Sequence, residues 1–301
     1  MIRSLLTGAI DYAGLFPPAA LAMPAAVRNY AAYRAGADAW ALGLFVVPAA
    51  RLGEMASAAE ALGSGGDARP WSVSALVTGD GAADFVAIAT FNEEYGSRGT
   101  GWSAVVDSVE GKGASADEIL ALAAHLPLDT TLFIEVPVER DPAPLLDAIA
   151  RTGHAAKIRT GGVIAAQFPR PEQIARFLRE CARLDLPFKA TAGLHHPLRA
   201  EYPLTYEPGS DRGTMFGFIN VLLAAAAARA GAEERELVAL LEERDPGALR
   251  VDAESVEWHG HRFATADIAS TRARFALSFG SCSFEEPLSD LRALGLLLPA
   301  R

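Results

Sequence analysis

The residues of this sequence most suited to covalent chemistry are its lysines. Only three of the 27 basic residues are lysine, namely Lys112, Lys157 and Lys189, and the rest are arginine. Arginine stays protonated in proteins, whereas a desolvated lysine can lose its proton and attack a carbonyl carbon. Because the composition uses arginine where a positive charge suffices, the three remaining lysines are candidates for a chemical role.

Lys157 and Lys189 each lie in a short apolar run that predicts a buried β-strand. Side chains alternate along a strand, so Lys157 shares a face with Arg159, and Lys189 shares a face with Thr191. Two ammonium groups on adjacent strands repel each other. One of them should therefore titrate below its ordinary pKa, unless the Glu135 carboxylate neutralises the pair. That electrostatic arrangement is typical of an enzyme that forms a Schiff base.

Further polar side chains fall near the ends of the same apolar runs. Glu135 and Asp107 are the carboxylates that we expect to act in catalysis by moving protons. The residues expected to bind substrate are Arg159, Thr160, Thr191, His195 and His196. His195 and His196 are adjacent, so on extended backbone only one of them can face a common site.

The elements that must position these residues alternate between strand and helix. Strands are predicted at 40–47, 71–78, 103–109, 131–138, 155–160 and 187–192, with a weaker one at 275–279. Helices are predicted at 25–35, 49–62, 82–94, 116–124, 143–151, 171–183, 214–230 and 233–243. The spacing of about 30 residues is that of one βα unit, and eight such units make a TIM-like (β/α)8 barrel. The seventh of the eight strands is not identifiable.

We predict an α/β fold with a single βα-barrel domain over residues 1–301. Residues 1–24 are expected to form an N-terminal arm that plugs the bottom of the barrel or reaches across a subunit interface. Residues 233–265 are expected to form a helix and a β-hairpin that turns at Gly260, and these either decorate the barrel or replace one of its units. An open doubly wound sheet is the alternative, but no glycine-rich phosphate loop follows the 40–47 strand.

Residues 132–194 resemble the second half of the deoxyribose-phosphate aldolase family. Phe133-Ile134-Glu135 is similar to a family strand that ends in Ile-Glu-Thr. Ala156-Lys157-Ile158-Arg159-Thr160-Gly161 resembles its Schiff-base strand, and Phe188-Lys189-Ala190-Thr191-Ala192-Gly193 resembles the strand after it. The resemblance implies a class I aldolase in which Lys157 forms the Schiff base and Lys189 is its electrostatic partner. The family's phosphate-binding glycines are replaced here by Leu194-His195-His196-Pro197.

Two other functions stay open at this point. A metal-dependent hydrolase would combine His195, His196, His259 or His261 with Asp107 or Glu135, and Lys157 could serve as a modified bridging ligand. If Gly260 only turns a hairpin, however, His259 and His261 are simply solvated. A non-catalytic barrel would bind a small acid through Arg159, Lys157 and Lys189. We favour the aldolase or lyase, and with it we predict no cofactor and no metal ligand.

The composition and charge of the chain exclude some classes of binding partner. The chain has 301 residues, is 50% hydrophobic and carries a formal charge of −10, which argues against nucleic acid as a partner. No signal peptide or membrane span is predicted, so we expect a soluble, cytoplasmic enzyme of small-molecule metabolism. A small-molecule substrate is expected, and a homo-oligomer is left open. The two cysteines form no disulfide framework, and Cys282 shows no activating context in the sequence.

Overall fold

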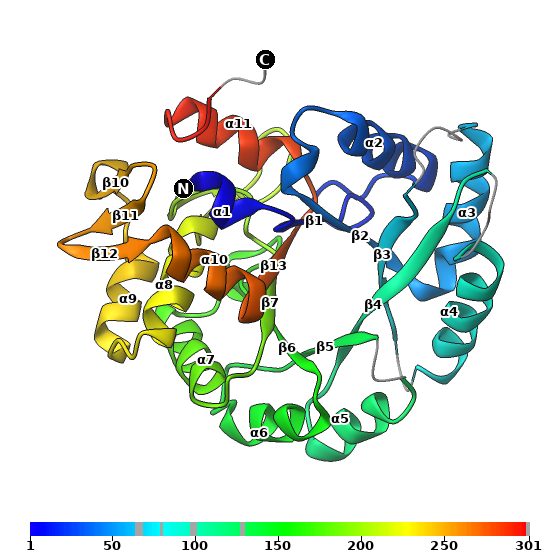
Figure 1. Cartoon of the computed structure of the whole chain (residues 1–301), viewed down its shortest axis with the longest axis horizontal. Helices are drawn as coiled ribbons and strands as arrows, with labels where there is room; N and C mark the ends of the chain where they lie inside the picture. The colour runs from blue at the N-terminus through cyan, green and yellow to red at the C-terminus, as the bar shows by residue number, and fades with distance from the viewer. Residues whose placement is uncertain (64–68, 79–80, 97–100, 127–129, 299–301) are drawn as a thin grey trace.

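The computed structural model describes residues 1–63, 69–78, 81–96, 101–126 and 130–298. Eight parallel strands close into a barrel in the order β1, β13, β7, β6, β5, β4, β3, β2. Their bounds are β1 (Ile10–Tyr12), β2 (Leu42–Pro48), β3 (Trp71–Leu76), β4 (Ala104–Lys112), β5 (Thr131–Glu135), β6 (Ala155–Arg159), β7 (Phe188–Thr191) and β13 (Ala276–Ser281). The predicted TIM-like (β/α)8 barrel is confirmed (Figure 1).

The helices surround the strands (Figure 1). They are α1 (Ile2–Leu6), α2 (Met23–Ala35), α3 (Leu52–Ala61), α4 (Ala82–Tyr95), α5 (Ala116–Ala123), α6 (Ala143–Thr152), α7 (Pro171–Arg183), α8 (Phe218–Arg229), α9 (Glu234–Glu242), α10 (Thr265–Arg274) and α11 (Glu285–Ala293). Short 3₁₀ turns occur at Ala39–Ala41, Ala49–Arg51, Ala165–Gln167 and Pro246–Ala248. Within the described part of the chain, no helix is both long and apolar enough to cross a lipid bilayer.

The barrel strand that sequence patterning did not identify is β1, the first strand of the barrel and not the seventh. It lies inside residues 1–24, which we had expected to form an arm, and it pairs with both β13 and β2. With three residues and an aspartate in the middle, β1 has too short an apolar run to be recognised. Residues that follow a barrel strand lie at the carboxyl ends, so the segment after β1 is not at the bottom of the barrel.

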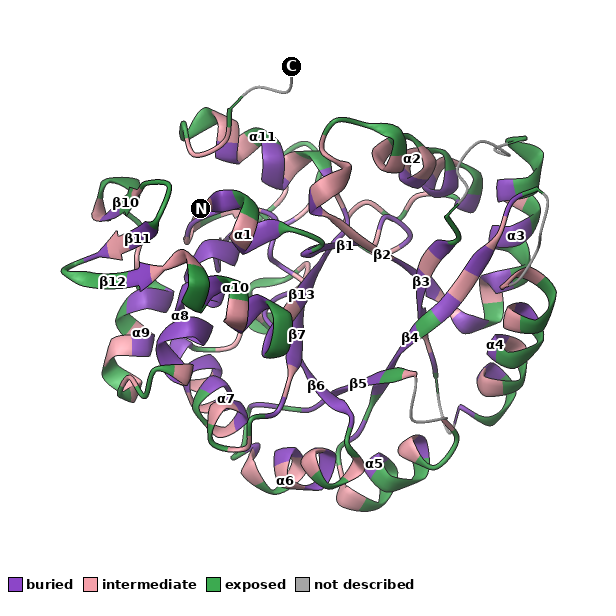
Figure 2. Cartoon of the chain, viewed as in Figure 1, coloured by how far each residue is buried: buried purple, intermediate pink, exposed green. Residues whose placement is uncertain are grey.

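Helix α7 shows how packing orients the strands beneath it. Ile174, Phe177, Leu178 and Cys181 recur every three or four residues and are all buried. The Phe177 ring meets the Phe188 ring of β7 edge to face, with centroids 5.5 Å apart. Because Phe188 faces outward to α7, the next residue along β7 must face the barrel interior. Figure 2 shows buried residues along the strands and on the inward sides of the helices.

The seventh βα unit carries extra elements between β7 and β13. A hairpin of β8 (Ala200–Pro203) and β9 (Arg212–Met215) precedes α8, so the helix begins at Phe218 and not at the predicted position 214. After α9 comes a small antiparallel sheet of β10 (Leu249–Val251), β11 (Ser255–Trp258) and β12 (His261–Ala264). The expected decoration near residues 233–265 is therefore present, including the hairpin turn at His259 and Gly260, which both have positive φ.

Candidate active site

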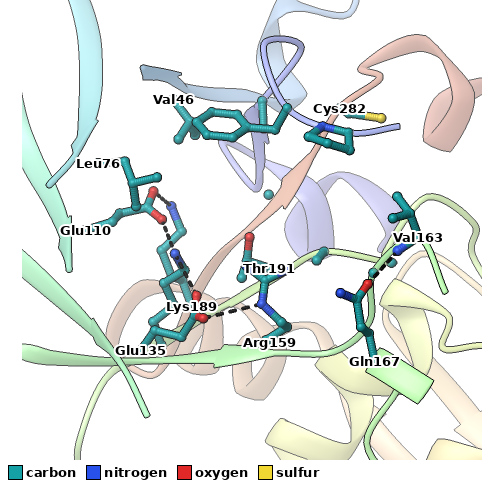
Figure 3. A pocket seen from close by; sticks show the side chains of 18 of the residues that line it. Val46, Leu76, Glu110, Glu135, Arg159, Val163, Gln167, Lys189, Thr191 and Cys282 are labelled. Atoms are coloured by element: carbon teal, nitrogen blue, oxygen red, sulfur yellow. Dashed lines mark hydrogen bonds and ion pairs between the residues drawn. The ribbon is translucent and has the colours of Figure 1, made fainter. Parts of the chain in front are cut away.

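A cavity of about 280 Å³ lies at the carboxyl ends of the barrel strands, where barrel enzymes hold their active sites (Figure 3). Lys157 of β6 and Lys189 of β7 both line it, and so do Glu110 of β4 and Glu135 of β5. Ala13, Phe16, Pro17 and Pro18, which follow β1, also contribute to its wall. The segment expected to plug the bottom of the barrel therefore helps to build the cavity at the opposite end.

The two lysines are direct neighbours in the barrel and share one carboxylate. Lys157 and Lys189 occupy the same register position on β6 and β7. Nζ of Lys157 is 2.8 Å from Oε2 of Glu110, and Nζ of Lys189 is 2.7 Å from Oε1 of the same side chain. All three side chains are at most 4% exposed. The prediction that both lysines face the barrel interior is confirmed.

Each lysine has a second carboxylate partner of its own. Nζ of Lys157 is 3.1 Å from Oε2 of Glu135, its neighbour in register on β5. Nζ of Lys189 is 2.5 Å from Oδ2 of Asp11 on β1, and the Ser278 hydroxyl donates to the same oxygen. The other oxygen of Asp11 accepts the backbone N–H of Leu44. A Cβ at Gly43 would overlap that oxygen, so glycine is required at this point of β2.

These contacts determine the protonation states of the buried groups. Burial opposes the charged form of Glu110, but Lys157 and Lys189 outweigh it and lower the pKa of that carboxyl. Burial also acts against protonated Lys189, yet Asp11 and Glu110 outweigh it and raise the pKa of that ammonium. We had expected one lysine to titrate low unless Glu135 neutralised the pair. The pKa of Lys189 instead shifts upward because of Asp11 and Glu110, and Glu135 pairs with Lys157 as expected.

Glu135 joins the lysine pair to the rim of the cavity. Its Oε1 accepts from Nε of Arg159 at 3.3 Å, and Lys112 approaches the same oxygen at 3.8 Å. Arg159 and Lys112 are much more exposed than the buried lysines, with side chains 44% and 71% exposed. Burial opposes ionisation of Glu135, but Lys157 and then Arg159 outweigh it and lower its pKa. The rim is therefore rich in positive charge.

The remaining predicted residues divide into two groups. Thr191 and His195 line the cavity, whereas Thr160, His196 and Asp107 do not. Asp107 is the extra residue of a β-bulge in β4 and is exposed, so the carboxylate that β4 supplies to the lysines is Glu110. His196 points elsewhere: its Nδ1 is 2.6 Å from Oδ2 of Asp290, and its ring stacks on Tyr202. Only one histidine of the adjacent pair faces the cavity, as alternation predicted.

Thr160 hydrogen-bonds to the turn that precedes His195. After β7, Ala192 and Gly193 both have positive φ, which turns the chain sharply. The Thr160 hydroxyl donates to the carbonyl of Ala192 at 2.7 Å and so ties β6 to this turn. A Cβ at Gly193 would meet the Gly161 backbone and the Phe168 ring. The turn thus brings His195 over the end of the barrel.

Sequence reasoning did not assign several residues of this site. Asp11 lies on the unrecognised strand, and Ser74 of β3 donates to Oε1 of Glu110 at 2.8 Å. Cys282, expected to be ordinary, follows β13 and lines the cavity with His195. Burial opposes its ionisation, but His195 outweighs it and lowers the pKa of the Cys282 thiol. If Ile10–Tyr12 had been recognised as a strand, Asp11 could have been placed among the barrel residues. No local pattern in the sequence identifies Cys282 as a residue of the site.

Two of the four histidines considered for a metal site, His259 and His261, lie in the hairpin of the small sheet. His259 and His261 have side chains 62% and 52% exposed and approach Glu243 and Glu236. Neither lines the cavity that holds the lysines. In the ranges that the structure describes, no three His, Cys, Asp or Glu side chains are grouped as ligands of one ion. Comparisons of the chain with protein-family models, characterised proteins and solved structures find no match.

Proposed function

We propose that the protein is an aldolase or lyase that forms a Schiff base between Lys157 and a small carbonyl substrate. The observation that carries this proposal is the position of Lys157: its ammonium lines a cavity and lies 2.8 Å from Glu110 and 3.1 Å from Glu135. A lysine that attacks a carbonyl must be able to give up a proton nearby, and two carboxylates are within reach.

The two lysines differ in their fitness as nucleophiles. Lys189 is 1% exposed, is held by Asp11 and Glu110, and has a raised pKa. It therefore stays protonated, and we assign it an electrostatic role beside the reacting amine. Lys157 shares Glu110 with it and has Glu135 as its second partner. These differences support the assignment of Lys157 as the nucleophile.

Glu135 is suited to move the protons of imine formation. Its Oε2 lies 3.1 Å from Nζ of Lys157, within reach of a proton that the amine gives up. In the proposed step Lys157 gives one proton to Glu135, and the amine adds to the carbonyl carbon. A second amine proton passes to the oxygen. Glu135 then returns its proton to the resulting hydroxyl, which leaves as water, and a protonated imine remains.

The rim of the cavity supports a preference for acidic substrates. Arg159 and Lys112 place two cationic groups beside Glu135, and an exposed guanidinium can bind a carboxylate through two N–H groups. We therefore propose a small keto acid as the best class of carbonyl compound. Pyruvate is the probe that matches this class, and acetone is the uncharged comparison.

Reductive trapping tests the proposal. The protein is incubated with pyruvate or acetone, treated with borohydride and digested, and the modified peptides are located by mass spectrometry. We expect the adduct at Lys157, with pyruvate trapped faster than acetone. The α-amino group of Met1, which does not line the cavity, is the internal control for nonspecific reductive alkylation. An adduct that forms at Met1 but not at Lys157, or labelling that persists unchanged in Lys157→Arg, would overturn the proposal.

A further inference from the structure

A second group of titratable side chains lies at the cavity, apart from the lysines. It consists of His195 after β7, Cys282 after β13, Glu286 on α11 and Tyr206 in the β8–β9 connection. His195 and Cys282 both line the cavity. Figure 3 draws Cys282 across the cavity from Glu110 and Lys189. Four chain segments thus meet at a place that the imine chemistry of Lys157 does not use.

We propose that His195 is a second catalytic acid–base residue, which exchanges a proton with the substrate oxygen remote from the imine. Glu286 and Cys282 are its positioning residues. This inference rests on the proposed function and extends it from imine formation to the making and breaking of a carbon–carbon bond.

The polar contacts of the His195 ring within the described residues all involve Nδ1. Nδ1 is 3.4 Å from the Ser281 hydroxyl, 3.5 Å from Oε2 of Glu286 and 3.9 Å from Sγ of Cys282. Within the described residues, Nε2 has no such partner. An imidazole that is anchored through one nitrogen presents the other to its surroundings, which here are the cavity. Nε2 is therefore the atom that can meet a substrate.

Tyr206 closes the group from the outside. Its hydroxyl donates to Oε2 of Glu286 at 3.0 Å and is 3.5 Å from Sγ of Cys282. The Tyr206 residue is half-exposed, whereas His195 is buried. The Glu286 carboxylate thus lies between Tyr206 and His195. The His196 ring, which is paired with Asp290, is a further neighbour of Glu286. This arrangement keeps a negative charge at the anchored side of the His195 ring.

That charge favours the protonated imidazole. Burial opposes protonation of His195, but Cys282 and Glu286 outweigh it and raise the pKa of His195 to about 9. Burial likewise opposes ionisation of Glu286, yet His195 and His196 outweigh it and lower its pKa. Near neutral pH, His195 is accordingly an imidazolium that can act as an acid.

Formation of the carbon–carbon bond requires an acid that protonates the aldehyde oxygen. Once the carbon beside the protonated imine gives a proton to the Glu135 carboxylate, an enamine is formed at Lys157. The enamine carbon then attacks an acceptor aldehyde, and a carbon–carbon bond forms. The aldehyde π electrons move to its oxygen, which takes the proton from His195, while the enamine nitrogen regains the imine double bond. In cleavage, neutral His195 removes the proton from that hydroxyl and each step reverses. Glu135 contacts Lys157, so a separate residue serves this more distant oxygen.

The experiment separates imine chemistry from bond formation. With pyruvate as donor and glycolaldehyde as acceptor, three quantities are measured: the borohydride adduct at Lys157, deuterium exchange of the pyruvate methyl group, and the condensation product by NMR. In His195→Gln we expect adduct and exchange to stay within about twofold of wild type. Condensation should fall at least about tenfold, since a general acid typically contributes a hundredfold or more. His125→Gln, which removes an exposed imidazole stacked on Phe85, is the matched control and should leave all three unchanged.

Glu286→Gln keeps the shape of the positioning residue but removes its charge. Because Glu286 raises the pKa of His195, the alkaline limb of the condensation pH profile should move to lower pH in this variant. If Glu286 served folding alone, Glu286→Gln would lower the condensation rate without moving the alkaline limb of the pH profile. An NMR titration of the His195 ring should show the same downward shift, whether or not the variant condenses the probes.

The outcomes distinguish the two proposals. Absence of a Lys157 adduct in the wild type overturns the proposed function and this inference together. A Lys157 adduct without condensation, or condensation that survives in His195→Gln, overturns only the inference. Equal loss of adduct and condensation in His195→Gln also overturns it, because His195 would then be needed for imine formation itself.

Discussion

Lys157 and Lys189 sit side by side in register on β6 and β7 and bind the two oxygens of one buried carboxylate, that of Glu110. Each ammonium has a second acid of its own, so three carboxylates neutralise two lysines and one arginine at the end of the barrel. Mutual repulsion of the lysines is therefore largely offset, and Lys189 has a raised pKa. The chemical difference between the two lysines comes from their second partners.

Glu110→Gln should be among the most destabilising single substitutions in the barrel. It leaves two buried ammonium groups short of a counter-charge, and breaking a buried pair in this way typically costs about 3–5 kcal/mol. Urea denaturation would measure the free energy of unfolding. Glu54→Gln is the control, because Glu54 pairs with Arg51 on the exposed side of α3 and should change little. Equal stability of the two variants would mean that the Glu110 cluster does not hold the barrel together.

Acid should destabilise the fold through the same carboxylates. The pKa values of Glu110 and Glu135 are lowered in the folded state, so the unfolded chain binds more protons as the pH falls. Their contribution to stability is complete above the ordinary glutamate value of about 4.3. It decreases below that pH and is lost as the pH falls through the folded-state values. The free energy of unfolding of Glu135→Gln should depend less on pH below about 4 than that of wild type. An unchanged slope would contradict this assignment.

Lys189→Met should affect imine formation in a pH-dependent manner. Removing the fixed positive charge beside Lys157 favours the protonated, unreactive amine. Borohydride trapping with pyruvate should therefore slow more at neutral pH than at pH 10, where protons are scarce. Slowing to the same extent at both pH values would show that Lys189 acts on structure and not on the charge of its neighbour.

Cys282 should react with iodoacetamide in preference to Cys181. Burial raises the pKa of the Cys181 thiol well above its ordinary value, whereas the His195 imidazole lowers that of Cys282 in spite of burial. Peptide mapping at neutral pH should find the label at Cys282, and His195→Gln should slow its modification. Rapid labelling of Cys181 in the folded protein, or an unchanged rate at Cys282 in the variant, would count against the thiol–imidazole pairing.

The repeated βα pattern was sufficient for the fold because it depends on local sequence. Apolar runs and helical spacing recur about every 30 residues, and closing them into a barrel is the common way to bury both faces of such strands. Strand alternation likewise predicted that Lys157, Arg159, Lys189 and Thr191 face inward. The barrel strand missed was β1, since three residues carry too little periodicity to detect.

The carboxylates and the second cluster depended on contacts across long stretches of chain. The β-bulge in β4 made Glu110, and not Asp107, the acid beside the lysines, and such a bulge is a response to packing that leaves no local signature. Asp11 meets Lys189 only because barrel closure pairs β1 with β13, which in turn pairs with β7, and so joins residues 178 positions apart. His195 and Cys282 meet across 87 positions for the same reason. Residue spacing determined which side chains face the interior, whereas barrel closure determined which of them became partners.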